Sequence, residues 1–247
     1  MNTRDPLQRP RRFYQAVSTL EAEDGTRILL DGRPARTPRR SILALPSGEL
    51  AQLVAEEWAR QGETLDLLGM GATRLARTAI DSGEAGMASA RESLLGYAAN
   101  DLICYFAAAP RTLVERQEQA WTPLLDWARE RLTLSFVRTA GVMHVSQSPS
   151  TLTRLARMLE AEAPFALTGL AAAAGLLGST ILALAMREGR LSAGDALATA
   201  RLDEVFQEEQ WGPDAEAMAR AEAMAGEAVL LERWFAALPS RLVIPEP

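Results

Sequence analysis

Hydrophobic and polar residues alternate with a period near two over residues 13–45, and with a period near 3.6 over most of the following chain. Asp-Gly pairs at 24–25 and 31–32 separate strand-like runs, an arrangement typical of β-hairpins. The pattern predicts a small antiparallel sheet that needs helices to pack against. We therefore expect an α+β fold, with an N-terminal β portion and basic arm over residues 1–45 and a helical domain over residues 46–247.

The first predicted helix begins at Ser47, a favourable N-cap residue, and ends at Gly62. Glu57 and Trp58 lie on its apolar flank. A tryptophan at the end of such a stripe is most simply a core residue. We expect Trp58 to lie in the core or between the two parts of the chain.

Residues 163–186 contain no charged side chain, so a membrane-spanning helix has to be considered. The run is only moderately apolar, because it includes Pro164, Gly175 and several other small or polar residues. Gly178-Ser179 is also a plausible break between two shorter helices. A buried helix pair, in which small residues permit close approach, explains the run better than a membrane span.

Residues 191–212 read as one helix that begins with a Ser192–Asp195 capping signature and stops at Gly212-Pro213. Leu202, Val205 and Phe206 lie on one side of it. The opposite stripe consists of four residues at i, i+3, i+4 and i+7, and hence on one face: Glu204, Gln207, Glu208 and Trp211.

This acidic stripe has two interpretations. Charged helix faces are usually solvated surface, and Trp211 would then be a core residue at the end of the face. Alternatively, the stripe and Gly212 form an acidic patch with an aromatic anchor that binds a basic surface of another protein. Residue spacing alone leaves both interpretations open.

The composition excludes some classes of function but does not identify one. The chain has 247 residues, is 48% hydrophobic and has a net charge of −6, which argues against nucleic acid as the main partner. The charge is unevenly distributed: residues 1–40 hold nine arginines and five acids, whereas residues 201–235 hold nine acids and three arginines. The N-terminal sequence lacks the apolar segment of a secretory signal, so we expect a cytoplasmic protein.

Candidate chemistry is sparse. The single Cys104 excludes an internal disulfide, and with only one histidine, His144, a Cys/His zinc site is not expected. Glu204 and Glu208 are a weak candidate for a metal or acid–base pair, because nothing else in the sequence converges on them. The alternative to a binding protein is a small-molecule enzyme that uses His144 with a nearby carboxylate. We expect no cofactor, no metal and no catalysis.

Five stretches together resemble the assembly chaperones of the F-type ATP synthase, which are known from mitochondria and alpha-proteobacteria. They are RRFYQAV at 11–17, LDGRPARTP at 30–38, LAQLVAEEWARQ at 50–61, ATRLARTAID at 72–81 and RLDEVFQEEQWG at 201–212. They occur in the order of the family and span most of the chain. No organelle-targeting extension is evident, which fits a bacterial protein.

The resemblance implies a two-part architecture and a non-enzymatic role, namely binding the unassembled alpha subunit and preventing its aggregation until it pairs with beta. It places the family's acidic helix motif on Glu204, with Gln207, Trp211 and Gly212 nearby, although the adjacent Asp203 is a second candidate for the acid. The family's Glu-Trp motif falls on Glu57 and Trp58. We expect a monomer that is not integral to the membrane and does not bind nucleic acid.

Overall fold

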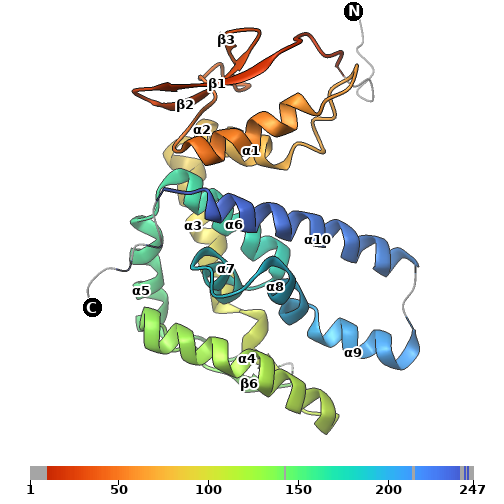
Figure 1. The fold of residues 1–247 in the computed structure, drawn as a ribbon. Coiled ribbons are helices and arrows are strands. Elements are labelled where there is room, and N and C mark those ends of the chain that lie inside the picture. The colour runs from red at the N-terminus through yellow and green to blue at the C-terminus, as the bar shows by residue number, and fades with distance from the viewer. Residues whose placement is uncertain (1–9, 142, 213–214, 240–241, 243, 245–247) are drawn as a thin grey trace, which may run out of the picture. The chain divides into compact units, whose positions relative to one another are not determined.

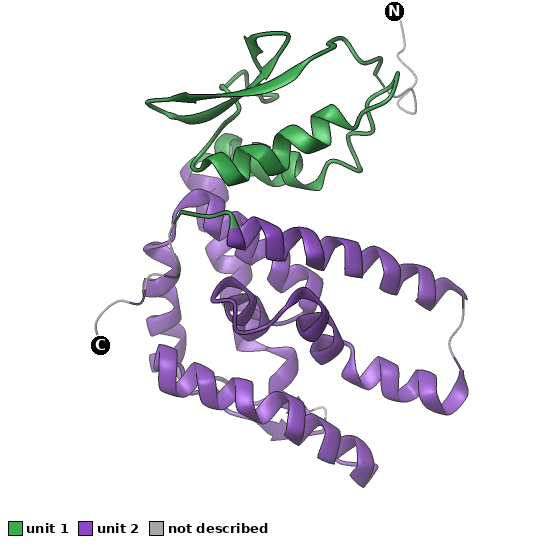
Figure 2. Cartoon of the chain, in the orientation of Figure 1, with its two compact units in different colours: residues 1–83, 237–239 green, residues 84–236, 240–247 purple. Residues whose placement is uncertain are grey.

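The structure is a computed structural model that describes residues 10–141, 143–212, 215–239, 242 and 244. The chain divides into two compact units (Figure 2). Unit 1 contains residues 1–83 and 237–239, and unit 2 contains residues 84–236 and 240–247. Strands at the start of the chain and helices in the remainder confirm the predicted α+β class (Figure 1).

Unit 1 contains an antiparallel sheet in which β2 pairs with each of its neighbours. Its strands are β1 (Val17–Ala22), β2 (Gly25–Leu30), β3 (Arg33–Pro34) and β4 (Ala44–Leu45). Both predicted hairpins form, since Ala22 pairs with Gly25 and Leu30 with Arg33. Asp31 and Gly32 have φ values of 49° and 75°. Positive φ at both central residues is the requirement of a type I′ turn, which Asp-Gly satisfies.

The core of unit 1 lies between the sheet and helix α1 (Gly48–Ala59). Alternate residues of β2 are buried, including Ile28 and Leu30, and α1 buries its apolar face. Ser47 caps α1 as predicted, because its Oγ accepts a hydrogen bond from the Leu50 amide at 3.1 Å. Helix α2 (Gly71–Asp81) packs on α1.

The boundary between the units lies at Gly83, whereas the change in hydrophobic period lies near residue 45. The two positions mark different properties of the chain. Strands give way to helices near residue 45, but α1 and α2 pack within unit 1 because the small sheet needs an apolar partner.

Unit 2 is mostly helical. Its helices are α3 (Gly83–Ala99, beginning on the last residue of the first segment of unit 1), α4 (Arg111–Leu132), α5 (Pro149–Glu160), α6 (Pro164–Leu177), α7 (Thr180–Arg187), α8 (Ala193–Ala200), α9 (Leu202–Trp211) and α10 (Ala215–Ala236). A 3-10 turn, η1 (Leu102–Cys104), and two short parallel strands, β5 (Tyr105–Phe106) and β6 (Thr139–Ala140), lie between them in the sequence.

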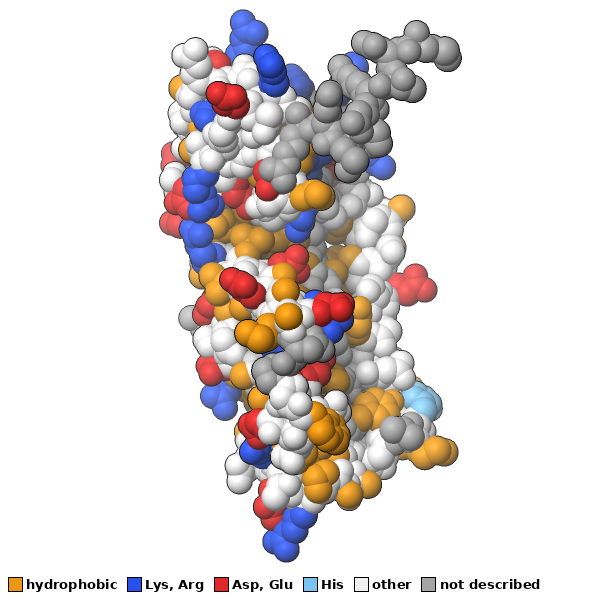
Figure 3. All heavy atoms as spheres, turned by 90° about the vertical axis from the view of Figure 1, so that its right-hand side faces the viewer, with side chains coloured by type: hydrophobic (Ala, Val, Ile, Leu, Met, Phe, Trp, Pro, Cys, Tyr) orange, Lys and Arg blue, Asp and Glu red, His pale blue; other side chains and the backbone are white. Residues whose placement is uncertain are grey.

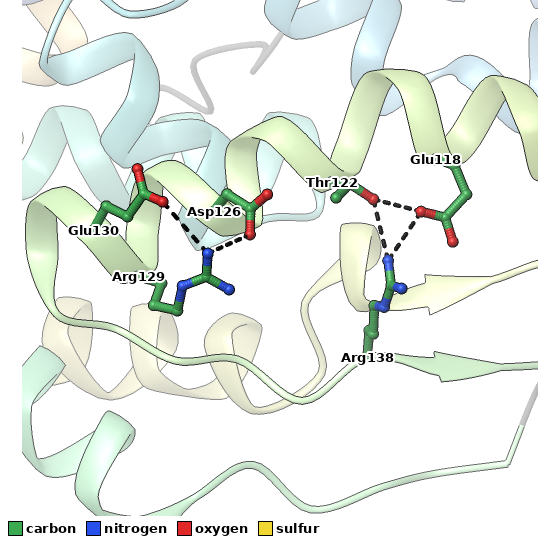
Figure 4. Close-up of polar contacts among 6 residues, drawn as sticks. All are labelled: Glu118, Thr122, Asp126, Arg129, Glu130 and Arg138. Atoms are coloured by element: carbon green, nitrogen blue, oxygen red, sulfur yellow. Dashed lines mark hydrogen bonds and ion pairs between the residues drawn. The ribbon is translucent and has the colours of Figure 1, made fainter.

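Arg138, just before β6, ties this strand pair to α4 (Figure 4). Its Nη1 donates to Oε2 of Glu118 at 2.9 Å and to the hydroxyl of Thr122 at 3.1 Å. Its guanidinium also lies 5.3 Å from the ring centre of Phe106 on β5. The hydrogen bond from Thr122, followed by that from Arg138, lowers the pKa of Glu118 below its usual value.

The uncharged run at residues 163–186 forms two helices, as predicted, and they pack against α10. α6 ends at Gly178, whose φ is 66°, and the Oγ of Ser179 caps α7. Gly169 permits the close approach, since a Cβ there would lie 2.8 Å from ring atoms of Trp234 and Phe235. None of the helices in the described part of the chain is both long enough and apolar enough to span a membrane.

The prediction of one continuous helix over residues 191–212 is wrong, because the chain breaks at Arg201 into two helices, α8 and α9. The Ser192 cap is confirmed, since its Oγ accepts from the Asp195 amide at 3.1 Å. The cause of the break is tertiary. The Trp121 indole on α4 donates at 3.1 Å to the Thr199 carbonyl, which the Asp203 amide would need in a continuous helix.

Candidate functional site

The stripe predicted on residues 204–211 lies on α9, a helix in which no residue is buried. Glu204, Gln207 and Trp211 are exposed and Glu208 is half-buried. The side chain of Trp211 is 82% exposed, so the interpretation of Trp211 as a core residue is wrong. The amide of Gln207 and the indole of Trp211 form no hydrogen bond with any described residue. These groups are therefore available to a partner.

Arg201 organises the acidic part of the stripe. Its Nε donates to Oε2 of Glu204 at 2.9 Å, and its Nη2 donates to Oε1 of Glu208 at 2.8 Å. The arginine side chain is only 13% exposed, whereas that of Glu204 is 67% exposed. One well-shielded guanidinium thus pairs with two carboxylates and offsets one of their two negative charges, so the stripe is less negative than the sequence suggests.

The opposite side of α9 is held on α4 by polar contacts. Nε2 of Gln117 donates to Oδ1 of Asp203 at 2.6 Å, and Arg116 forms an ion pair with Glu209 at 2.7 Å. The Arg116 guanidinium also lies 5.3 Å from the ring centre of Phe206. Leu202, Val205 and Phe206, which the sequence places on one side of the helix, are only half-buried, because α9 lies at the edge of unit 2. Asp203 is thus engaged within the chain, whereas Glu204 faces outward.

The stripe borders a hollow of about 580 Å³. The wall from α9 includes all five predicted positions: Glu204, Gln207, Glu208, Trp211 and Gly212. Arg201 and three residues of α10, namely Ala217, Arg220 and Met224, complete it. The hollow thus combines an aromatic ring, a thioether, two carboxylates and two guanidinium groups, a mixture that suits a protein surface better than one charged ligand.

Figure 3 shows the side of the molecule on which α9 ends and α10 begins (the right-hand side of Figure 1). Hydrophobic, acidic and basic side chains are interspersed there and do not segregate into single-sign patches. Gly212 ends α9 as predicted, with a φ of 84° and an amide that donates to the Glu208 carbonyl at 2.8 Å. Its predicted companion, Pro213, lies outside the described residues.

Glu57 and Trp58 lie in unit 1 and are both buried. The carboxylate of Glu57 accepts three hydrogen bonds of 2.8 Å at the start of α2, from the Ala72 amide, the Thr73 amide and the Thr73 hydroxyl. The N-cap residue of α2, Met70, provides no side-chain cap. Glu57 therefore supplies from α1 the capping group that α2 lacks.

The catalytic alternative gains no support from the geometry. The hydrogen-bond partner of His144 Nδ1 is the Tyr105 hydroxyl at 3.2 Å, where the alternative requires a carboxylate. Burial raises the pKa of Cys104 well above its usual value, so its thiol is not an activated nucleophile. Within the described ranges, no three His, Cys, Asp or Glu side chains are grouped so that they could hold a metal ion.

Sequence reasoning missed the residues that complete the hollow. Arg201 could have been found, because it precedes Glu204 by three positions and Glu208 by seven, both on one helical face. Arg220 and Met224 could not, because their place depends on how α10 packs beside α9. No local pattern encodes that packing.

Comparison with known proteins identifies the family. The family described as ATP12 chaperone protein matches residues 11–129. The chain is 26% identical over 223 residues to Protein atp12, mitochondrial, of Schizosaccharomyces pombe, covering 84% of this chain and 76% of that protein. It is 39% identical to the crystal structure of Atp12 from Paracoccus denitrificans, with a TM-score of 0.85, covering 92% of this chain and 98% of that one.

A structure from Agrobacterium tumefaciens, described as a candidate chaperone, is 38% identical with the same TM-score, covering 92% of this chain and 86% of that one. Both structural matches exceed 30% identity over most of their own length. The chain therefore belongs to the ATP12 chaperone family, the ATP synthase assembly chaperones that its motifs resemble, and it is not an enzyme.

Proposed function

We propose that this protein binds the unassembled alpha subunit of the F-type ATP synthase in the bacterial cytoplasm and prevents its aggregation until alpha pairs with beta. The observation that carries the proposal is the exposed stripe of Glu204, Gln207 and Trp211 beside an open hollow. An unpaired subunit exposes an interface meant for its neighbour, and such apolar surfaces aggregate.

The hollow provides contacts of the kind such a client needs. Trp211 and Met224 offer apolar area, and an exposed tryptophan is a frequent anchor of protein interfaces. Glu204 offers a carboxylate to a basic side chain. We assign the family's acid to Glu204 and not Asp203, because the Glu204 side chain is 67% exposed, whereas Asp203 is half-buried against Gln117 of α4.

The test is an aggregation assay in which denatured alpha subunit is diluted into buffer with and without the protein. We expect the wild-type protein to keep alpha in the supernatant. Trp211→Ala and Glu204→Lys should each weaken binding of alpha about tenfold or more, since loss of an interface anchor commonly costs ~2 kcal/mol.

Glu92→Lys is the matched control, because Glu92 is exposed on α3 and carries the same charge change outside the hollow. It should bind alpha as the wild type does. Circular dichroism melting establishes that all three variants are folded. Wild-type affinity in both Trp211→Ala and Glu204→Lys would show that α9 does not contact the client.

We further propose that Glu57 acts by holding α2 on α1. Glu57→Ala removes the acceptor of three buried hydrogen bonds, and should lower the free energy of unfolding by about 3 kcal/mol. The adjacent Glu56→Ala, on the half-buried side of α1, should change it by less than about 1 kcal/mol. Chemical denaturation of both variants checks the difference, and equal losses would refute the capping role.

A further inference from the structure

Unit 1 contains a second hollow, of about 630 Å³, which the proposed function does not use. Phe13 and Tyr14 line it from the segment before β1, Arg33 and Arg36 from β3 and the loop after it, and Trp58 from the end of α1. Three of the five stretches that carry the family resemblance, RRFYQAV, LDGRPARTP and LAQLVAEEWARQ, thus meet at one place. They are far apart in the sequence and come together only through the fold.

The rim of this hollow is positively charged. Neither Arg33 nor Arg36 forms an ion pair with a described residue, and Arg36 donates only to the Arg40 carbonyl at 2.7 Å. Asp31 also lines the hollow, and its single negative charge offsets only one of the two arginines, while its carboxylate accepts hydrogen bonds from the Gln15 and Ala16 amides. The amides of Ala16 and Gln15 hold the pKa of Asp31 below its usual value, so it stays a satisfied anion.

The wall is aromatic. Phe13 is 70% exposed and meets Tyr14 edge-on, with 5.3 Å between the ring centres. Tyr14 lies 5.6 Å from Trp58 and donates its hydroxyl proton to the Trp58 carbonyl at 2.7 Å. An exposed phenylalanine on a fixed aromatic base offers a contact surface at little entropic cost.

Trp58 itself is 8% exposed, yet its indole N–H has no hydrogen-bond acceptor among the described residues. A buried donor without an acceptor is costly, commonly by about 1–3 kcal/mol. A ligand oxygen that reached this N–H would provide the acceptor that the chain does not. The two guanidinium groups, which carry a net positive charge even beside Asp31, and the unsatisfied indole donor therefore favour the same ligand chemistry, an anionic oxygen.

We propose that the hollow binds an extended acidic peptide segment of a partner protein. One carboxylate of the segment lies between Arg33 and Arg36, and a neighbouring apolar side chain packs on Phe13. The volume of the hollow, about 630 Å³, and its aromatic wall favour a peptide over a small anion, which would leave Phe13 uncovered. This hollow shares no residue with the one beside α9, so binding to it is tested without the alpha subunit.

The experiment is an NMR titration of the full-length protein with acetylated, amidated hexapeptides. The first alternates leucine with aspartate, and the others replace aspartate with asparagine or lysine. The readout is the set of tryptophan indole N–H resonances, of which the Trp58 signal is assigned by its absence in Trp58→Phe. We expect only the aspartate peptide to shift the Trp58 signal in a saturable way.

Two double variants with the same change in charge distinguish binding in the hollow from nonspecific electrostatic attraction. Arg33→Glu with Arg36→Glu should weaken binding of the aspartate peptide about tenfold or more, because it replaces both cations with like charges. Arg39→Glu with Arg40→Glu changes the same loop outside the hollow and should leave binding within about twofold. Phe13→Ala should weaken binding with little effect on the melting temperature, because Phe13 is exposed.

Equal weakening by both double variants would show nonspecific charge attraction and overturn the site. A saturable shift with the asparagine peptide of equal affinity would overturn the acidic character of the ligand. Absence of a saturable Trp58 shift with the aspartate peptide up to millimolar concentration would overturn the proposal as a whole.

Discussion

Helices α7 and α9 are both short helices of unit 2, yet they are stabilised in opposite ways. All eight residues of α7 are buried, and none of the ten residues of α9 is. The side chains of Ser179 and Asp101 accept hydrogen bonds from Leu182 and Ile181 in the first turn of α7. The N-cap residue of α9, Arg201, provides no side-chain cap, and α9 is held by polar contacts to α4.

This difference in burial and capping indicates that α7 has a structural role, whereas α9 is suited to recognition. Burial and capping fix α7, so changes there should alter the free energy of unfolding. α9 contributes little to the core, so its outward side chains are free to contact a partner. Substitutions at matched positions test this division.

The first effect, a clear loss of stability, is expected in the packing of α6 with α10. Gly169→Ala places a Cβ 2.8 Å from ring atoms of Trp234 and Phe235, both buried and unable to yield. We expect it to lower the free energy of unfolding by about 1–3 kcal/mol. Gly175→Ala on the same helix meets only the Tyr97 hydroxyl at 3.8 Å, so it should be neutral or stabilising by up to about 1 kcal/mol. Urea denaturation measures both, and equal effects would contradict the packing argument.

The next effect is a pH dependence that arises from the capping of α7. Burial raises the pKa of Asp101 from 3.8 to about 7, against hydrogen bonds from Ser179 and from backbone amides. The folded state therefore keeps a proton that the unfolded chain releases, and this contribution to stability is lost as the pH rises from about 4 to about 7.

Asp101→Asn should remove that slope from the free energy of unfolding, measured by urea denaturation across this pH range. Asp126→Asn is the control, because the Asp126 side chain on α4 is 45% exposed, unlike the fully buried Asp101, and is paired with Arg129 at 2.9 Å (Figure 4). It should leave the slope unchanged. A slope that persists in Asp101→Asn would assign the proton to another group.

A smaller effect is expected at the base of α9. Arg201 and Arg129 each join two carboxylates, which for Arg129 are those of Asp126 and Glu130 (Figure 4). The Arg129 side chain is 56% exposed, whereas that of Arg201 is 13% exposed. Arg201→Ala should cost about 1 kcal/mol and Arg129→Ala less than about 0.5 kcal/mol, because shielded pairs are screened less by water. Thermal melting at low and high salt compares them, and a larger loss for Arg129→Ala would reverse the argument.

The smallest effect on stability is expected at the end of α9. Trp211→Ala should change the free energy of unfolding by less than about 0.5 kcal/mol, since its ring lies in solvent. Trp121→Ala removes a buried ring and should cost about 3–5 kcal/mol. Denaturation curves of the two variants check this contrast. A cost above about 2 kcal/mol for Trp211→Ala would place it in the core after all.

Sequence was most informative where local chemistry decides the structure. The Asp31-Gly32 turn, the Ser47 cap and the break at Gly178 depend on residues that adopt few conformations, so their neighbours hardly matter. The outward stripe of α9 was also predictable, because helical spacing places those residues on one face whatever packs behind them.

Features set by distant contacts were not predictable. The break at Arg201 depends on Trp121, and the hollow beside α9 depends on residues of α10 such as Arg220. The capping of α2 by Glu57 crosses from one helix to another. In each case the decisive group is brought close by packing, which a single sequence does not reveal.

Unit 1 is discontinuous, since residues 237–239 return to it after residues 84–236 of unit 2. The hydroxyl of Ser47, at the start of α1, donates to the carbonyl of Ala237, 190 residues later. During synthesis, that carbonyl leaves the ribosome after every helix of unit 2. The first part of the protein to emerge is therefore among the last to be completed, and any truncation before Ala237 would leave a defect at the opposite end of the chain.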